Sequence, residues 1–289
     1  MSGAVKSAAR NLLHASGITA GVRFWYRKGV RILMYHRFPA QSELDAQCKH
    51  LSTYYRPVSL STALRERPAN AVVVTIDDGY RDFLTNAWPI FKAHSIPALV
   101  YVATDLPDHN SWLWTEQLTQ FLREQGDLGA AETIKTRLKK IPDDKRRAYL
   151  NTLPNLRVSP PPAFAPMSWE EIRMLAKEGV EFGAHTRSHP ILSRLPDQDA
   201  MRAEIGGSKE RLEQELGMRI AHFCYPNGMP ADYNDDVLAV VRECGFETAV
   251  TGVKGINSAD SNPYLLRRLH QEPEHPVESF AHQVAGLYR

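Results

Sequence analysis

The chain has 289 residues, of which 43% are hydrophobic and 24% charged, the composition of a globular protein with a sizeable core. The formal net charge is +2 and the body of the chain has no concentrated Lys/Arg tract, so no nucleic-acid partner is expected. Its three cysteines, Cys48, Cys224 and Cys244, lie far apart without metal-ligand spacing, which indicates free thiols in a reducing compartment.

The N-terminal segment, residues 1–31, carries six basic residues and no acidic one. Polar and basic residues interrupt its apolar stretches, so it predicts neither a transmembrane helix nor a secretory signal. Two interpretations stay open. Residues 1–30 form a basic helical segment packed on a single domain spanning 1–289, or residues 1–31 rest on an anionic membrane surface. Because the segment predicts neither a membrane span nor a secretory signal, we expect a cytoplasmic protein. In the second interpretation it contacts the inner face of the membrane peripherally.

Short apolar runs predict buried parallel strands over residues 31–35, 71–76, 98–102, 180–183, 220–224 and 248–251. Helices are predicted between them, over 85–94, 168–179, 199–217 and 235–245. Ser168 and Glu171 have the spacing of a capping box at the start of one of these helices. Strands alternating with helices imply right-handed βα units, and six or seven such units favour an α/β barrel over an open sheet.

The pattern changes between residues 105 and 166. A charged helical stretch follows Trp112 and Trp114, and it closes in a proline-rich run over 159–166. The stretch has too few core positions for an independent domain, so we expect a helical insertion on the catalytic face of the barrel. The two tryptophans either stack on sugar rings or anchor the insertion.

The first candidate site residues, Asp77 and Asp78, follow the second predicted strand. The C-terminal ends of barrel strands are where catalytic groups lie. Adjacent side chains on an extended chain point in different directions, so one carboxylate can bind a metal while the other acts as a base. Considered alone, the pair would favour helix capping or the magnesium site of a phosphohydrolase.

His185 and His189 also follow a predicted strand, at a spacing of four residues. On a helical turn, imidazoles at this spacing face the same side and can chelate one ion. Two histidines and one carboxylate, with positions left for water, are typical of a catalytic metal site.

Three segments now carry a resemblance to a known family. Residues 75–80, residues 185–189 and Tyr225-Pro226-Asn227-Gly228 resemble the first three motifs of the NodB-homology polysaccharide deacetylases, carbohydrate esterase family four. The likeness extends over roughly residues 30–270, with Ile76 in place of the first motif's Phe. It implies a distorted (β/α)7-type barrel, in agreement with the number of βα units expected from the strands.

The resemblance also implies roles. Asp78, His185 and His189 would bind one divalent metal ion, usually zinc, and Asp77 would be the general base. The metal ion lowers the pKa of a bound water, and the base takes a proton from that water as it attacks an acetyl carbonyl. The backbone N–H of Asn227 would stabilise the oxyanion.

The general acid departs from the family's usual pattern. Its customary LxH motif is only loosely matched at the segment that ends in His270. His36 closes a predicted strand at the same barrel mouth, in a segment that resembles the MYH of circularly permuted relatives acting on poly-N-acetylglucosamine. We expect His36 rather than His270 to donate the proton.

The third motif departs as well, because Cys224 stands where the family has an arginine that orients the base. A hydrophobic strand end does not favour a thiolate, so we expect Cys224 to be structural rather than nucleophilic. Arg267 or Arg268 is a candidate for the missing positive charge.

The leading functional hypothesis is metal-dependent removal of N-acetyl groups from an amino-sugar glycan or glycan intermediate. The alternatives are a magnesium phosphohydrolase and a non-catalytic glycan-binding relative. A cytoplasmic location would suit a lipid-linked or nucleotide-linked sugar as substrate.

Overall fold

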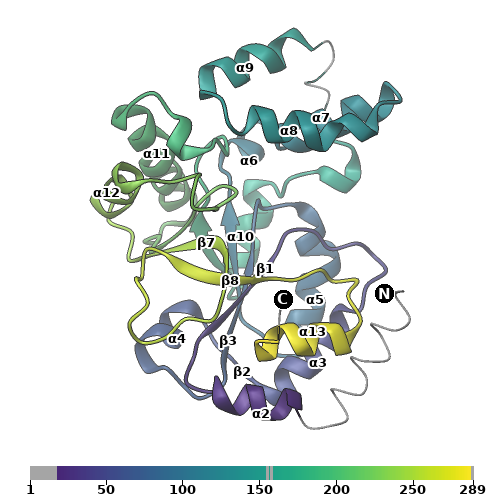
Figure 1. Ribbon diagram of the computed structural model, residues 1–289, viewed down its shortest axis with the longest axis vertical. Helices are drawn as coiled ribbons and strands as arrows, with labels where there is room; N and C mark the ends of the chain where they lie inside the picture. The colour runs from purple at the N-terminus through teal and green to yellow at the C-terminus, as the bar shows by residue number, and fades with distance from the viewer. Residues whose placement is uncertain (1–17, 154–155, 157–158, 288–289) are drawn as a thin grey trace.

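The protein was analysed as a computed structural model, which describes residues 18–153, 156 and 159–287. Its centre is a sheet of eight parallel strands (Figure 1). They are β1 (Arg31–Tyr35), β2 (Arg56–Pro57), β3 (Ala71–Ile76), β4 (Ala98–Val102), β5 (Glu181–Ala184), β6 (His222–Cys224), β7 (Thr248–Lys254) and β8 (Leu266–His270).

The sheet closes on itself because β1 pairs with both β8 and β3. The strand order is β1-β8-β7-β6-β5-β4-β3-β2, so seven strands form the ring and the two-residue β2 pairs with β3 outside it. The predicted distorted (β/α)7 barrel is confirmed. The runs predicted over 31–35, 71–76 and 98–102 match β1, β3 and β4 at both ends.

Eight helices outside the insertion accompany the barrel among the described residues: α2 (Ile18–Trp25), α3 (Leu44–Tyr54), α4 (Leu60–Glu66), α5 (Trp88–Ala93), α10 (Trp169–Lys177), α11 (Gln198–Leu216), α12 (Asp235–Glu243) and α13 (Val277–Ala285). The predicted capping box is present at the start of α10. Ser168 Oγ accepts from the Glu171 N–H at 3.2 Å, and Glu171 Oε2 accepts from the Ser168 N–H at 3.0 Å. The helix predicted over 85–94 differs, because a π-helical turn, Phe83–Ala87, precedes α5.

The sheet separates two apolar layers, because successive side chains along a strand point to opposite faces of the sheet. On β3, Val73 faces the interior cluster, whereas Val72 and Val74 face the outer cluster under the helices. Leu60 and Ala63 of α4 join the interior cluster at the end where the strands begin. The opposite end, where the strands finish, is therefore the one left for a site.

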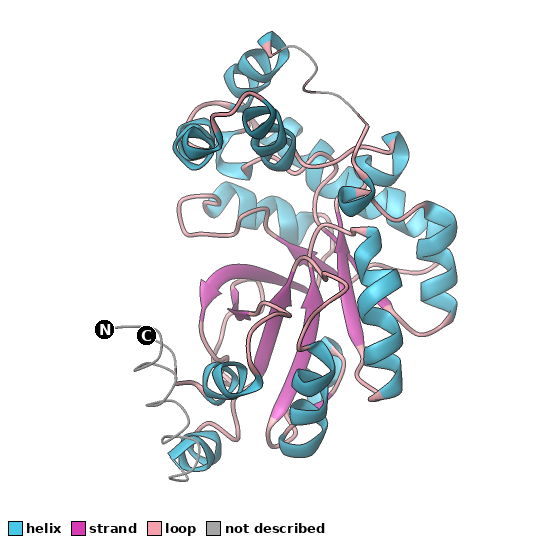
Figure 2. Ribbon diagram, turned by 90° about the vertical axis from the view of Figure 1, so that its right-hand side faces the viewer, coloured by secondary structure: helices cyan, strands magenta, loops and turns pink. Residues whose placement is uncertain are grey.

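The insertion between β4 and β5 is helical, as expected. It comprises α6 (Asp105–His109), α7 (Trp114–Glu124), α8 (Ala131–Leu138) and α9 (Asp143–Thr152), with short 3-10 turns between and after them. Figures 1 and 2 show these helices over the end of the barrel where the strands finish. Trp112 is buried beneath them, with its ring 5.4 Å from that of Phe164, and so anchors the insertion.

The helix α2 lies at the other end of the barrel, beside α13 (Figure 1). It exposes 64% of Phe24 and 81% of Trp25. Within the described part of the chain, no helix combines the length and apolar content required to cross a bilayer. Residues 1–17 of the N-terminal segment fall outside that part.

Candidate active site

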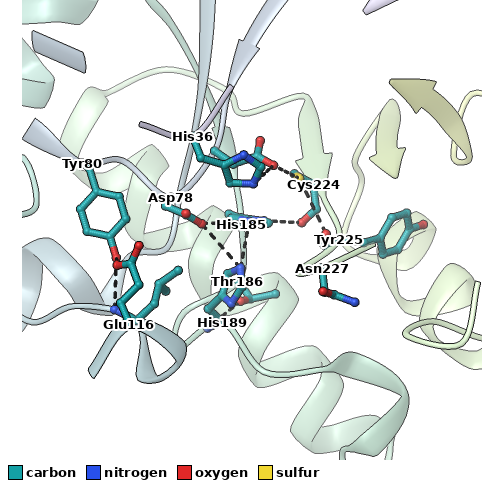
Figure 3. Close-up of polar contacts among 12 residues, drawn as sticks. His36, Asp78, Tyr80, Glu116, His185, Thr186, His189, Cys224, Tyr225 and Asn227 are labelled. Atoms are coloured by element: carbon teal, nitrogen blue, oxygen red, sulfur yellow. Dashed lines mark hydrogen bonds and ion pairs between the residues drawn. The ribbon is translucent and has the colours of Figure 1, made fainter. Parts of the chain in front are cut away.

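The two carboxylates come directly after β3, and an unusual backbone turns them apart. Asp78 and Gly79 both adopt the left-handed region, with φ of 75° and 87°. A Cβ at Gly79 would reach only ordinary contact with the methyl groups of Val102, at 3.4 Å, so it is the positive φ that favours glycine there. Asp77 bonds to Arg268 of β8. Asp78 is directed toward His185, in the loop that follows β5 (Figure 3).

His185 and His189 do not lie on a helical turn, so that part of the prediction is wrong. Thr186 and His189 have φ of 65° and 57°, and these two left-handed residues bring the imidazoles together instead. The Thr186 hydroxyl accepts the His189 N–H at 3.0 Å, and the Thr186 carbonyl accepts from Thr104 at 3.2 Å. The loop is thus held to β4 as well as to itself.

The three predicted metal ligands converge on one point. Asp78 Oδ1 lies 3.5 Å from His185 Nε2 and 3.6 Å from His189 Nε2, and the two Nε2 atoms are 3.2 Å apart. Zinc bound at about 2.0–2.1 Å by four tetrahedral ligands would separate those ligands by about 3.3 Å. The trio therefore fits a tetrahedral ion with one position left open.

Hydrogen bonds and burial set the protonation of this trio. The Cys224 carbonyl only accepts, and it lies 2.8 Å from His185 Nδ1, so Nδ1 carries a proton and Nε2 is the nitrogen turned toward Asp78. Burial, reinforced by the adjacent His185, lowers the pKa of His189 to about 3. Burial by itself would raise the pKa of Asp78, but the hydrogen bond from His185 and the nearby His189 bring it below its usual range. The site offers a carboxylate and, at His189, a neutral imidazole.

A second trio among the described residues, Asp77, His185 and Cys224, also has ligand atoms within 4.8 Å of one another. It is a poorer site. Both oxygens of Asp77 are bonded to Arg268, and burial raises the pKa of the Cys224 thiol.

Asp77 is held by Arg268 of β8, one of the two arginines considered for this role. Arg268 Nη1 lies 2.7 Å from Asp77 Oδ1, and Nη2 lies 2.7 Å from Oδ2. Burial would raise the pKa of Asp77, but the guanidinium outweighs it and holds that pKa well below its usual range. Cys224 Sγ is 3.2 Å from the same guanidinium, so it shares the pocket without supplying charge.

Both candidate acids reach the site. His36 Nε2 is 3.6 Å from Asp77 Oδ2, and the His36 ring is 5.7 Å from that of His270. His270 Nε2 is bound 3.1 Å from Glu272 Oε1. Burial lowers the pKa of His270, whereas Glu272 opposes that change. Only His36 is in direct reach of the predicted base.

Asn227 sits in a tight loop after β6, with φ of 59°. Its side-chain amide donates to Asp232 Oδ2, which also accepts the Met229 N–H at 2.8 Å. The next residue, Gly228, has φ of 65°, and a Cβ there would lie 2.5 Å from the Gly252 nitrogen. Across the described ranges, no hydrogen-bond partner is found for the Asn227 backbone N–H.

Glu116 of α7 was not predicted as a site residue. It bonds to the Tyr80 hydroxyl (Figure 3). It also lies 3.5 Å from Arg37 Nη1. Burial raises its pKa to about 7, helped by the charge of Asp78. Nothing in the local sequence distinguishes Glu116 from the other charged residues of the insertion.

A cleft of about 600 Å³ joins these groups. Its barrel side includes His36, Asp77, Asp78, His185, His189 and Asn227, and its outer wall is built from Trp114, Glu116, Lys135 and Lys139 of the insertion. Trp114 is 9% exposed and belongs to the insertion's own apolar cluster with Leu118 and Leu122, while part of it lines the cleft.

Comparison with known proteins identifies related sequences and structures. A sequence model of the polysaccharide deacetylase family matches residues 65–249. YxkH of Bacillus subtilis (strain 168), provisionally named a polysaccharide deacetylase, is 20% identical over 270 residues, which are 89% of this chain and 76% of YxkH.

Two solved structures share the fold. The Streptococcus pyogenes deacetylase PplD, in complex with acetate, has a TM-score of 0.64 at 22% identity, over 89% of this chain and 98% of PplD. IcaB from Ammonifex degensii has a TM-score of 0.63 at 22% identity, over 90% of this chain and 96% of IcaB. At these identities the likeness shows the fold alone.

Proposed function

Because this chain belongs to the polysaccharide deacetylase family, we propose that it hydrolyses the N-acetyl group of an amino sugar in a glycan or glycan intermediate, with one divalent metal ion, zinc, as cofactor. The observation that carries the proposal is the convergence of Asp78, His185 and His189 at separations of 3.2–3.6 Å, beside a second, independently held carboxylate. A metal site next to a base, in a cleft at the C-terminal ends of barrel strands, is suited to hydrolysis of a carbonyl compound.

Asp78, His185 and His189 would hold the ion, which when bound polarises a carbonyl oxygen and lowers the pKa of water. Asp77, kept ionised by Arg268, accepts a proton from the water that attacks the acetyl carbon. The Asn227 N–H donates to the carbonyl oxygen as it becomes negative. His36 then protonates the departing nitrogen, the C–N bond breaks, and acetate and a free amine result.

The bonds from Arg268 also make Asp77 a weak base, because they stabilise its ionised form. The proton therefore does not rest on Asp77. His36 Nε2, 3.6 Å from Asp77 Oδ2, is within a short movement of receiving it. In this proposal the pair moves one proton from the water to the leaving nitrogen.

The test is acetate release from N-acetylglucosamine oligomers together with the metal content of the purified protein. Wild type should release acetate and hold one zinc ion. Asp77→Asn should keep the metal and lose the activity, while His185→Ala should lose both. Metal bound without acetate release from any N-acetylated sugar would reject the deacetylase proposal.

The two alternatives predict different results. A magnesium phosphohydrolase would use oxygen ligands, whereas two of the three convergent groups here are imidazoles, which suit zinc better. A glycan-binding relative would retain oligomers on a column without releasing acetate.

We also propose that α2 rests on an anionic membrane surface. Phe24 and Trp25 are largely exposed, and Arg23, Arg27 and Lys28 lie beside them. The first acidic residue of the chain is Glu43, so charge and apolar exposure in this segment both favour an anionic bilayer.

A further inference from the structure

Two lysines of the insertion face the catalytic cleft. Lys135 lies on α8 and Lys139 directly follows it, one helical turn later, and both line the cleft that contains the metal-ligand trio. Positive charges at this spacing repel each other and slightly destabilise a helix. Their shared position in the cleft wall therefore calls for a negative group between or beside them.

Lys139 has no carboxylate at ion-pair distance among the residues that the structure describes. Its ammonium is half-buried and donates to Asn227 Oδ1 at 2.8 Å, a neutral acceptor. Asp232, whose charge acts on Lys139, already accepts from the Asn227 amide and the Met229 N–H. Burial lowers the pKa of Lys139, although the charge of Asp232 opposes that change.

Lys135 is only partly compensated. Its side chain is 16% exposed, and it pairs with Glu132, whose own side chain is 83% exposed. Because Glu132 lies largely in water, its charge is screened, and an ion pair with so exposed a partner contributes little. Lys135 therefore keeps positive charge that can act on a ligand in the cleft.

The negative groups elsewhere in the cleft already have partners. Asp77 is paired with Arg268, and Glu272 lies 3.1 Å from His270. Glu116 is bonded to Tyr80 and has a pKa raised by burial to about 7. The positive potential along the α8 wall is therefore left for whatever enters the cleft.

We propose that Lys135 and Lys139 form a subsite for an anionic substituent, a phosphate or a carboxylate, on the N-acetylated sugar that the enzyme processes. The inference rests on the proposed function, because it assigns the substrate class of the same cleft. The contact of Lys139 with the Asn227 side chain places the subsite beside the group proposed to hold the oxyanion. The anion accordingly belongs to the sugar undergoing deacetylation or to its immediate neighbour.

Another role for Lys139 would be to hold Asn227 in position without touching substrate. The two roles separate in the kinetics. A positioning role lowers kcat on every substrate equally, whereas an anion subsite raises KM only for charged ones and weakens as salt is added.

The kinetic experiment compares acetate release from three probes: neutral N-acetylglucosamine oligomers, N-acetylglucosamine 1-phosphate and N-acetylmuramic acid. Wild type should prefer one of the charged probes, and which one identifies the anion as phosphate or carboxylate. Lys139→Gln and Lys135→Gln should each reduce kcat/KM for that probe about tenfold, a clearly larger loss than for the neutral oligomers. The matched control is Lys140→Gln, since Lys140 is adjacent in sequence but exposed.

Equal losses on neutral and charged probes, or the same loss in Lys140→Gln, would overturn the subsite. A calorimetric measurement separates this result from failure of the deacetylase proposal. With chelator present, so that no metal can hold the anion, wild type should bind the preferred charged probe more tightly than N-acetylglucosamine. Lys139→Gln should abolish the difference. If wild type binds the charged probe more tightly but releases no acetate from it, the subsite is retained and the deacetylase proposal is rejected. If wild type binds both sugars equally, the subsite is rejected.

Discussion

Arg268 donates two hydrogen bonds of 2.7 Å to Asp77 across the barrel, although the two residues are 191 positions apart in sequence. Cys224, where the resembling family has an arginine, contacts the same guanidinium at 3.2 Å. The positive charge beside the base is thus present but comes from β8. Both partners are nearly inaccessible to water, which makes this an ion pair whose halves depend on each other.

Loss of this arginine should destabilise the protein and shift its pH profile. We expect Arg268→Met to lower the free energy of unfolding by about 3–5 kcal/mol at neutral pH, because a buried carboxylate loses its partner. In wild type the pKa of Asp77 lies below its unfolded value, so its contribution to stability is present above the unfolded pKa and is lost as pH falls through the folded one. Without Arg268, burial dominates and the acid limb of kcat/KM moves to higher pH. Urea unfolding and pH-rate profiles would measure both effects. Arg267→Met, at an exposed neighbouring position, should show neither.

Metal removal should lower thermal stability through His185 and His189. Zinc at a hundred times its Kd would stabilise the folded state by about 2.7 kcal/mol. We expect chelation to lower the Tm of wild type, and zinc to restore it. His185→Ala should have a Tm that does not respond to either treatment, while His109→Ala, at an exposed position, should respond like wild type. A chelator-insensitive wild type would argue against the metal site.

The two candidate acids should differ in their effect on turnover. Positioned acid catalysis contributes about 10²–10⁴-fold, so His36→Asn should reduce kcat within that range. His270→Asn should have a much smaller effect, because its imidazole is bound to Glu272 rather than to the base. Steady-state kinetics on one N-acetylated substrate would compare them. A larger loss in His270→Asn would reverse the assignment.

The thiol of Cys224 should be dispensable for chemistry. Burial raises its pKa, so the thiolate needed for nucleophilic attack is scarce at neutral pH. We expect Cys224→Ser to retain most of its activity, and iodoacetamide not to inactivate the folded enzyme. Rapid, stoichiometric alkylation at Cys224 with loss of acetate release would contradict this.

The exposed aromatic residues of α2 should confer binding to anionic vesicles. We expect the wild-type protein to sediment with vesicles of phosphatidylcholine and phosphatidylserine, and not with phosphatidylcholine alone. Replacing both Phe24 and Trp25 with alanine should release it. Tyr149→Ala removes an aromatic side chain that is 40% exposed, on α9 of the insertion, and should have no effect. Equal binding to neutral vesicles would exclude an electrostatic contact.

The sequence was sufficient to locate the strands that consist of continuous apolar runs. Residues 71–76 are all buried and rich in β-branched side chains, and this pattern has few alternatives. β8 was harder to place, because Leu266-Arg267-Arg268-Leu269-His270 carries charges that mask its strand character. Arg268 is tolerated in the interior only because Asp77 lies opposite, a fact that no local window contains.

Some residues of the candidate site could be predicted from the sequence, and others could not. Asp77, Asp78, His185 and His189 lie in short motifs whose residue types suggest their chemistry. The backbone that brings the histidines together was not predicted, because a non-glycine residue in the left-handed region leaves no clear trace in sequence. Glu116 and Lys139 could not be selected from a charged helical stretch, since their placement depends on how the insertion docks against the barrel.

The catalytic groups of the cleft and the residues of its outer wall come from different segments of the chain. The groups assigned to the reaction follow strands β1, β3, β5 and β6, whereas Trp114, Lys135 and Lys139 belong to one uninterrupted stretch between β4 and β5. The stretch leaves β4 at its C-terminal end and returns at Pro166, which pairs with Tyr80 just after the neighbouring strand β3, so both of its ends lie at the mouth of the barrel. A different segment could therefore replace it as a single piece while the catalytic groups stay in register. Substrate choice in such a protein can diverge by exchange of one loop, without any change to the reaction it performs.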